Sequence, residues 1–119
     1  MKLTNGQIYN YILKMNEAFS NFNEPLPVKF NFYINKNQQT LYNLAQTIEH
    51  TRDDILGTEK NEKLKEYKLQ QLAEIEQDVD IKMIPVDWLT NDMKLTQEQL
   101  LSIMFMIDDK QEKEENLNE

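Results

Sequence analysis

His50, the only histidine in the chain, is the residue whose surroundings come nearest to a chemical site. Asp53 and Asp54 follow it at positions i+3 and i+4, where a helix would place the imidazole and both carboxylates on one face. These groups could share a divalent cation, but a single imidazole without a second histidine is a weak ligand set for a transition metal. We therefore predict a solvated helix face here, with no metal site and no cofactor.

The other side chains with catalytic potential are isolated as well. Asp78 and Asp80 would share one face of a strand, as a paired-carboxylate site requires, but no nucleophile, glycine loop or basic partner accompanies them. Ser20 and Ser102 lack the glycines of a nucleophile elbow. The sequence contains no cysteine, which removes thiolate nucleophiles and zinc sites built on sulfur. We predict no catalytic residue and no enzymatic activity.

The charge of the chain is concentrated in its second half. Residues 1–58 carry five acids and five bases, so residues 59–119 hold the whole net charge of −8. Because an acidic surface repels phosphate backbones and Arg52 is the only arginine, we expect no direct binding to nucleic acid. A less favoured alternative is that the acidic half imitates a nucleic acid in the basic cleft of another protein. No apolar run approaches the ~18–20 residues that cross a membrane, so we expect no membrane contact.

The first element that could position these residues is a helix beginning after Thr4. Thr4 and Gln7 have the spacing of a capping box. Apolar residues then recur every three or four positions, namely Ile8, Tyr11, Ile12, Met15, Phe19 and Phe22. We expect this helix to end before Pro25.

Residues 26–56 allow two interpretations. Alternate positions are apolar at the start of the segment, which is a strand pattern: Val28, Phe30, Phe32 and Ile34. The same segment also opens a series with heptad spacing: Phe30, Ile34, Asn37, Leu41, Leu44, Ile48, Thr51 and Ile55. No turn residue interrupts this series, so we favour one helix from about residue 27 to 56, stopped by Gly57. Spacing alone leaves strand or helix open for residues 28–35.

A second helix should follow at once, with Thr58 as its N-cap and an extent of about 59–78. A turn this short makes the two helices antiparallel, so we predict a long helical hairpin. Residues 79–85 then alternate in polarity and stop at a proline, which indicates a short strand. Residues 86–89 would make one helical turn that places Trp88 against the core.

The last helix repeats the opening motif, because Thr96 and Gln99 again have capping-box spacing. We expect it to run to about Asp108. The predicted fold class is mainly α, with an N-terminal helix, a long antiparallel helical hairpin, a short β segment and a C-terminal helix. Residues 1–108 would form one helical domain, followed by an acidic flexible tail over residues 109–119.

Four apolar residues of the last helix are candidates for binding a partner: Leu101, Met104, Phe105 and Met106. Unbranched methionine side chains adapt to varied partners, which favours a protein-binding surface. The alternative, which we weigh more heavily, is that these residues fill a core that is otherwise short of apolar bulk.

The long helix offers a second set of contact residues, Asn37, Leu41, Leu44 and Ile48. A buried asparagine in such a seam can fix the register and the oligomeric state of packed helices, so a homo-oligomer is one expectation. Equally, Asn37 could lie where the seam meets solvent.

The order of these elements resembles a family of short proteins of unknown function encoded by phages and prophages of Firmicutes. The segments that carry the likeness are residues 3–8, 26–29, 34–37, 79–81, 95–96 and 106–108. The resemblance covers residues 3–108, favours the helical interpretation of residues 27–36 and carries over no catalytic residue.

What the resemblance implies about function is a phage origin and action by binding protein. We therefore expect a non-enzymatic phage protein in the cytoplasm of the bacterial host, where it would inhibit or redirect a host or defence factor. The alternative is a small structural or assembly component of the virion, in its tail or baseplate region.

Overall fold

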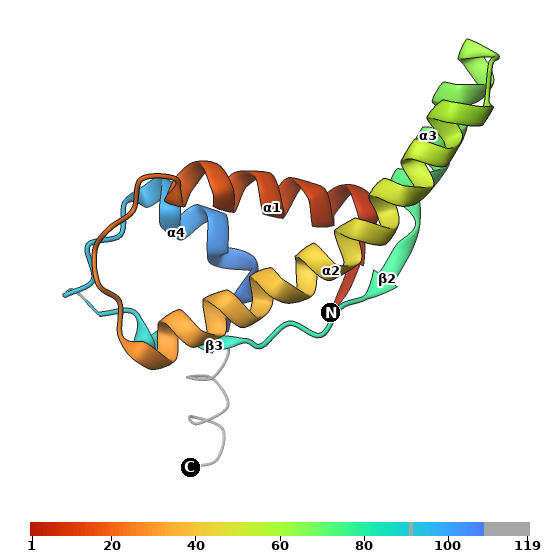
Figure 1. The fold of residues 1–119 in the computed structure, drawn as a ribbon. Coiled ribbons are helices and arrows are strands. Elements are labelled where there is room, and N and C mark those ends of the chain that lie inside the picture. Colours follow the sequence, from red (N-terminus) through yellow and green to blue (C-terminus); the bar gives the residue numbers. More distant parts are fainter. Residues whose placement is uncertain (91, 109–119) are drawn as a thin grey trace.

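The computed structural model describes residues 1–90 and 92–108, and these residues form a mainly helical fold built around a helical hairpin (Figure 1). In chain order the elements are β1 (Lys2–Thr4), α1 (Asn5–Phe19), α2 (Val28–Thr58), α3 (Glu62–Glu74), β2 (Glu76–Asp78), β3 (Ile84–Pro85), the 3-10 turn η1 (Val86–Trp88), α4 (Gln97–Ile103), the 3-10 turn η2 (Met104–Met106) and β4 (Ile107–Asp108). The predicted fold class is confirmed. The predicted acidic tail, residues 109–119, lies outside the described residues.

α1 begins with the capping box that the sequence predicts. The Thr4 hydroxyl accepts from the Gln7 backbone N–H at 3.1 Å, and the Thr4 backbone N–H donates to the Gln7 side chain at 2.8 Å. The helix ends at Phe19, so Phe22 belongs to the following connection rather than to the helical stripe. Its buried face, which includes Ile8 and Met15, points into the core.

α2 is one continuous helix from Val28 to Thr58, so the strand interpretation of residues 28–35 is wrong. Its buried positions are Phe30, Ile34, Asn37, Leu41, Ala45 and Ile48. Leu44, expected in the seam, is only half-buried, because a straight helix of 3.6 residues per turn drifts from a 3.5-residue repeat and turns Ala45 inward instead.

The turn of the hairpin lies later than the sequence predicts. α2 continues past Gly57, whose φ is negative, and ends at Thr58, whose hydroxyl donates to the Asp54 carbonyl at 2.7 Å. Asn61, not Thr58, caps α3 by accepting from the Leu64 backbone N–H at 3.0 Å. A threonine that donates back to its own helix is not free to cap the next one.

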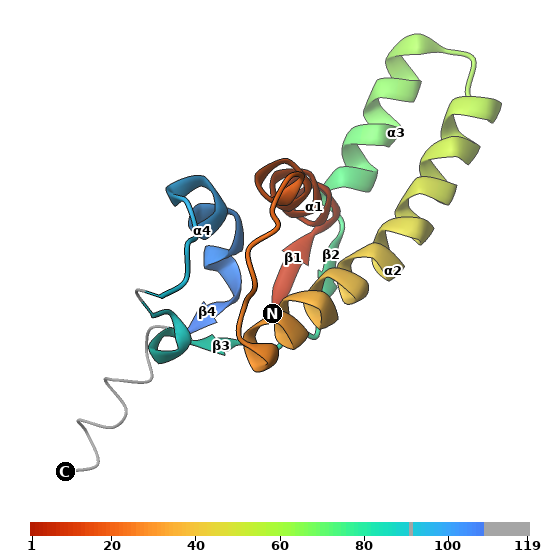
Figure 2. The ribbon, with the colours of Figure 1, turned by 60° about the vertical axis from the view of Figure 1, so that its left-hand side comes forward.

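The hairpin projects from the body of the molecule as an arm, which we define as residues 50–75 (Figures 1 and 2). α3 buries no residue completely. The radius of gyration is 17.6 Å, whereas a compact domain of this size has about 13 Å. The arm is therefore the part of the fold that is stabilised least by burial of side chains in the core.

Two short strand pairs close the body, in place of the one strand predicted for residues 79–85. β1 pairs antiparallel with β2, with Leu3 opposite Gln77, and β3 pairs parallel with β4, with Ile84 opposite Ile107. The chain between β2 and β3, which we call the extended segment, belongs to neither strand pair, although Val79 exchanges main-chain hydrogen bonds with Met1 at 2.7 and 3.2 Å. Val79 and Ile81 are buried and pack in the core.

α4 ends at Ile103, five residues before the predicted end, because residues 104–106 tighten into η2 and residues 107–108 become β4. Pairing with β3 requires an extended backbone at Ile107, which a continued helix would not allow. Figure 2 looks nearly along α1, with α4 on one side and the α2–α3 hairpin on the other. The core lies where these helices meet, around Ile8, Leu41 and Ile103.

Candidate functional site

The most exposed apolar group on the last helical segment is formed by Leu101 and Met104, with Phe105 beside them; we call these three residues the α4 surface. The side chain of Leu101 is 65% exposed and that of Met104 50%, and the two are one helical turn apart. Phe105 is half-buried, because its ring stacks on Tyr11 with 3.9 Å between the ring centroids. Apolar side chains that remain exposed beside each other are typical of protein-binding surfaces.

Met106, the fourth residue of the predicted partner surface, is fully buried and takes no part in it. The sequence left open whether the four residues form a partner surface or part of the core, and the structure divides them. Leu101 and Met104 are exposed, Met106 is in the core and Phe105 is half-buried. Ile103 is also fully buried. The opposite face of this segment is therefore core, and the exposed face is held in place by it.

Polar contacts fix α4 against α1. Thr96 and Gln99 form the predicted capping box, with bonds of 3.1 and 2.8 Å. The buried Gln99 side chain also donates to the Ala18 carbonyl of α1 at 3.0 Å. Because Gln99 contacts Ala18 while Phe105 contacts Tyr11, the two segments run antiparallel. The segment that carries the α4 surface is therefore held against α1 by contacts near both of its ends.

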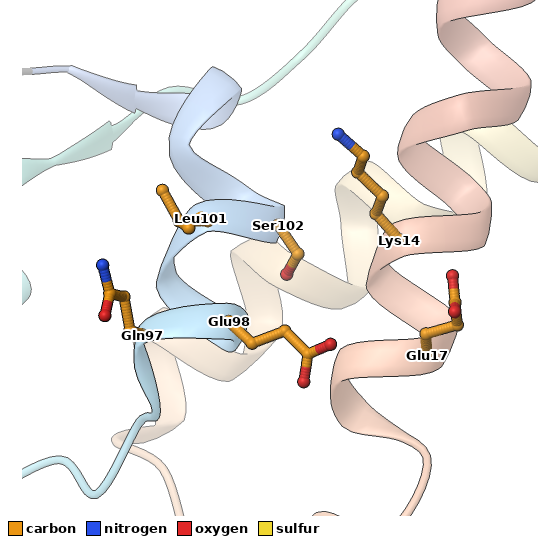
Figure 3. A pocket seen from close by; sticks show the side chains of 6 residues that line it. All are labelled: Lys14, Glu17, Gln97, Glu98, Leu101 and Ser102. Atoms are coloured by element: carbon orange, nitrogen blue, oxygen red, sulfur yellow. The ribbon is translucent and has the colours of Figure 1, made fainter.

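A groove of about 520 Å³ lies between α1 and α4, next to Leu101 (Figure 3). Its lining residues are Lys14, Glu17, Gln97, Glu98, Leu101 and Ser102. Figure 3 shows the Glu98 and Ser102 side chains reaching from α4 toward α1. With two carboxylates and one ammonium, the groove carries a net negative charge, which favours basic groups on anything that enters it.

Asn37, Leu41, Leu44 and Ile48, the residues predicted to set register or oligomeric state, contribute to the core of the chain itself. Asn37 is fully buried, and its amide nitrogen donates to the Lys82 carbonyl at 2.9 Å while its oxygen accepts from the Lys82 backbone N–H at 2.7 Å. Leu41 and Ile48 are buried and Leu44 is half-buried. These residues therefore fix the register of α2 against the extended segment, and a homo-oligomer through this seam stays a prediction.

Of the side chains weighed for chemistry, Ser102 is buried and its hydroxyl donates to the Gln99 carbonyl at 2.7 Å, whereas the others lie on solvated surfaces. The His50 Nε2 atom is 3.8 Å from Asp54 Oδ2, and both side chains are more than two-thirds exposed. Asp78 lies 3.6 Å from the Lys2 ammonium, also in solvent. Within residues 1–90 and 92–108, no group of three His, Cys, Asp or Glu side chains is arranged to hold a metal ion.

The sequence pattern did not identify an exposed apolar pair at the start of α2. Val28 is 86% exposed and Phe32 59%, and the neighbouring Tyr33 ring packs edge-on against Trp88 with 5.0 Å between centroids. The Lys29 ammonium lies 5.0 Å from the centroid of the same Trp88 ring. The strand-like alternation of this segment carried the signal, because on a helix it turns Phe30 inward and Phe32 outward.

Among residues 1–90 and 92–108, two titratable groups have displaced pKa values. A hydrogen bond from the Lys68 ammonium at 2.8 Å, together with one from the Asn61 backbone N–H, holds the pKa of the Glu59 carboxyl below its ordinary value. Burial, followed by the nearby Glu49 carboxylate, raises the pKa of the Tyr9 phenol. Glu59 lies at the tip of the arm and Tyr9 at its base, so neither belongs to the α4 surface.

In the described part of the chain, no helix combines the length and apolarity needed to span a membrane. No protein-family model matches the sequence, and neither does a curated protein or a solved structure.

Proposed function

We propose that this protein has no enzymatic activity and acts by binding another protein through the α4 surface. The observation that carries the proposal is that Leu101 and Met104 remain at least half exposed on a short segment whose other face is core. Removing apolar area from water stabilises a complex by about 25 cal/mol per Å². A partner that covers both side chains would therefore gain binding free energy from their burial. Met104 can also adjust its shape to the partner.

The charge of the surroundings indicates which partner surface would fit. Glu17 and Glu98 border the groove beside Leu101, and the chain carries a net charge of −8. A partner with an apolar anchor flanked by lysine or arginine would be attracted over several ångströms and oriented before contact. The resemblance to phage proteins supports a bacterial host or defence factor as this partner, met in the host cytoplasm.

The test is affinity capture from a lysate of the bacterial host, with quantitative mass spectrometry of the captured proteins. Wild-type protein is expected to enrich a specific partner, and Leu101→Asp and Met104→Asp are each expected to reduce its capture at least about tenfold, as for anchor residues of an interface. Val28→Asp is the matched control, because Val28 is more exposed than either residue but lies at the start of α2. Equal capture by the wild type and both α4 variants would overturn the proposal.

A second candidate function, a structural or assembly component of the virion tail or baseplate, is favoured by the extended shape. The molecule measures 58 × 37 × 21 Å, and its exposed large apolar residues are spread over several parts of the surface, among them the α4 surface, the start of α2 and the arm. Several apolar contact areas on one chain are typical of a subunit with several neighbours. Mass spectrometry of purified particles would separate the two functions, because a virion component is present in stoichiometric amounts and a host-directed binder is absent.

A further inference from the structure

α3 packs against α2 and, near its C-terminal end, against α1, and it carries further apolar side chains that remain exposed. Leu69 and Leu72 are half-buried, and Leu72 packs against the core. A second row, which we call the outer stripe, follows the spacing i, i+3, i+7, i+11 and consists of Leu64, Tyr67, Gln71 and Ile75. Its three apolar members are 42–59% exposed. A helix that is apolar on two sides is normally covered on both.

The outer stripe also borders a hollow that the hairpin does not fill. A groove of about 560 Å³ lies between α2 and α3, and Ile55, Leu72 and Ile75 contribute to its lining. The Gln71 side chain, which lines the same groove, donates to the Tyr67 hydroxyl at 3.3 Å. The groove and the stripe therefore form one continuous, partly apolar side of the arm.

We propose that the outer stripe is a dimerisation surface, on which α3 of a second copy of this chain lies antiparallel about a two-fold axis. In such a symmetric interface residue i contacts residue j of the other copy, and j contacts i. Setting Leu64 of one copy against Ile75 of the other pairs the apolar ends of the stripe twice and places Tyr67 of each copy opposite Gln71 of the other. This surface is separate from the α4 surface, so the inference does not depend on the proposed function.

Charge complementarity identifies the second copy as the occupant. Lys63 and Glu74 are exposed, and both border the stripe on the same flank, four positions before Tyr67 and seven after it. Eleven residues of helix separate them by about 16 Å, too far for contact within one chain. In the antiparallel arrangement Lys63 of each copy lies near Glu74 of the other, which creates two equivalent ion pairs. No salt bridge within the described residues occupies either side chain.

The first experiment measures the mass of the full chain by size-exclusion chromatography with light scattering, at concentrations up to about 100 µM. A dimer of twice 14.3 kDa is expected, with dissociation on dilution. Leu64→Asp is expected to weaken dimerisation at least about 100-fold, because it places a carboxylate in the apolar row. Circular dichroism verifies that this variant is folded, as expected for a substitution at an exposed position. A wild-type monomer at the highest concentration would overturn the inference.

The decisive experiment is a charge exchange between the two flanking residues. Lys63→Glu and Glu74→Lys are each expected to weaken the dimer about tenfold, and the double variant is expected to restore it to within about threefold of wild type. Rescue has to arise between copies, because the two residues cannot reach one another in one chain. Leu101→Asp and Lys14→Glu serve as matched controls outside the arm and should leave the dimer intact. A dimer that Leu101→Asp dissociates, or single variants that the double variant does not rescue, would place the contact elsewhere.

Discussion

At the scale of single residues, Asn37 shows how a polar side chain can be required by an apolar core. Its amide group donates to and accepts from the main chain of Lys82, as a neighbouring strand would, and it also lies 3.2 Å from the Met106 sulfur. A buried amide costs free energy unless its donors and acceptors are satisfied. Here they are satisfied by the main-chain carbonyl and N–H of Lys82.

Asn37→Leu should therefore destabilise the protein, although leucine has a similar volume and greater hydrophobicity. The two main-chain groups of Lys82 would lose their partners, at a cost of about 1–3 kcal/mol for each group that stays shielded from water. We expect a loss of about 2–4 kcal/mol in the free energy of unfolding, measured by urea denaturation. Asn43→Leu is the control, because Asn43 is exposed and bonded only to Gln39. Equal effects of the two variants would contradict this role for Asn37.

Glu59 should make part of the stability depend on pH. Its pKa in the folded protein is below its ordinary value of 4.5, so its ionised form stabilises the fold above that pH. This contribution is lost as the pH falls through the lowered pKa, when the carboxyl becomes protonated in the folded state as well. Glu59→Gln should therefore lower the melting temperature more at about pH 6 than at about pH 3. Thermal melts at both pH values measure the difference, with Glu17→Gln as a control outside the arm.

At the scale of elements, the two capping boxes decide where α1 and α4 begin. Both were predictable, because Thr-x-x-Gln before an apolar run depends only on local contacts. α4 has seven residues, too few for a helix that is stable in isolation. We therefore expect the loss of its N-cap to disturb the conformation of the α4 surface.

Thr96→Ala should destabilise the protein by about 1 kcal/mol, the usual cost of losing an N-cap side chain. Urea denaturation measures this loss, and binding of the partner by the variant should weaken in parallel because α4 frays. Thr90→Ala is the matched control, because Thr90 contributes only its backbone carbonyl, to the Met93 N–H. An unchanged free energy of unfolding in Thr96→Ala would show that Gln99 holds the helix start without its partner.

Local signals predicted how elements begin better than how they end. The sequence pattern predicted α2 as a helix and the hairpin after it, because heptad spacing over many residues outweighs a short alternation. It misplaced the turn at Gly57 and Thr58, where helical hydrogen bonds to Ile55 and Asp54 prevailed over the usual preferences of glycine and threonine. The early end of α4 depends on pairing between Ile84 and Ile107, which lie far apart in the chain and leave no local signal.

The same limit applied to the candidate site. The sequence shows one run of apolar residues that contains Leu101, Met104, Phe105 and Met106. The change from α helix to 3-10 turn after Ile103 leaves Leu101 and Met104 exposed and buries Met106. The exposed apolar residues of the arm could not be predicted either. The apolar residues of α3 lie on two sides of the helix, so their spacing does not form a single stripe that marks the buried side.

At the scale of the whole molecule, the arm and the body should differ in local stability. α3 buries no residue, whereas α2 is anchored in the core from Phe30 to Ile48. Amide hydrogens of α3 should therefore exchange faster than those of residues 34–48, by local opening rather than global unfolding. Hydrogen exchange followed by mass spectrometry at low protein concentration measures this, and Leu64→Asp, expected to be monomeric, provides the reference. Equal protection of α3 and the anchored part of α2 in that variant would contradict the expectation.

The pairing of β1 with β2 has a consequence for how the chain is made. Leu3 lies opposite Gln77, so the strand synthesised first has no partner until more than seventy further residues have left the ribosome. Contacts between residues so distant in the chain form slowly, because a long loop has to close before they are rewarded. The hairpin, whose contacts are local, can assemble during translation, whereas the β1–β2 pair at its base forms only after β2 has been synthesised. A nascent chain halted before residue 76 would thus hold β1 without its partner strand.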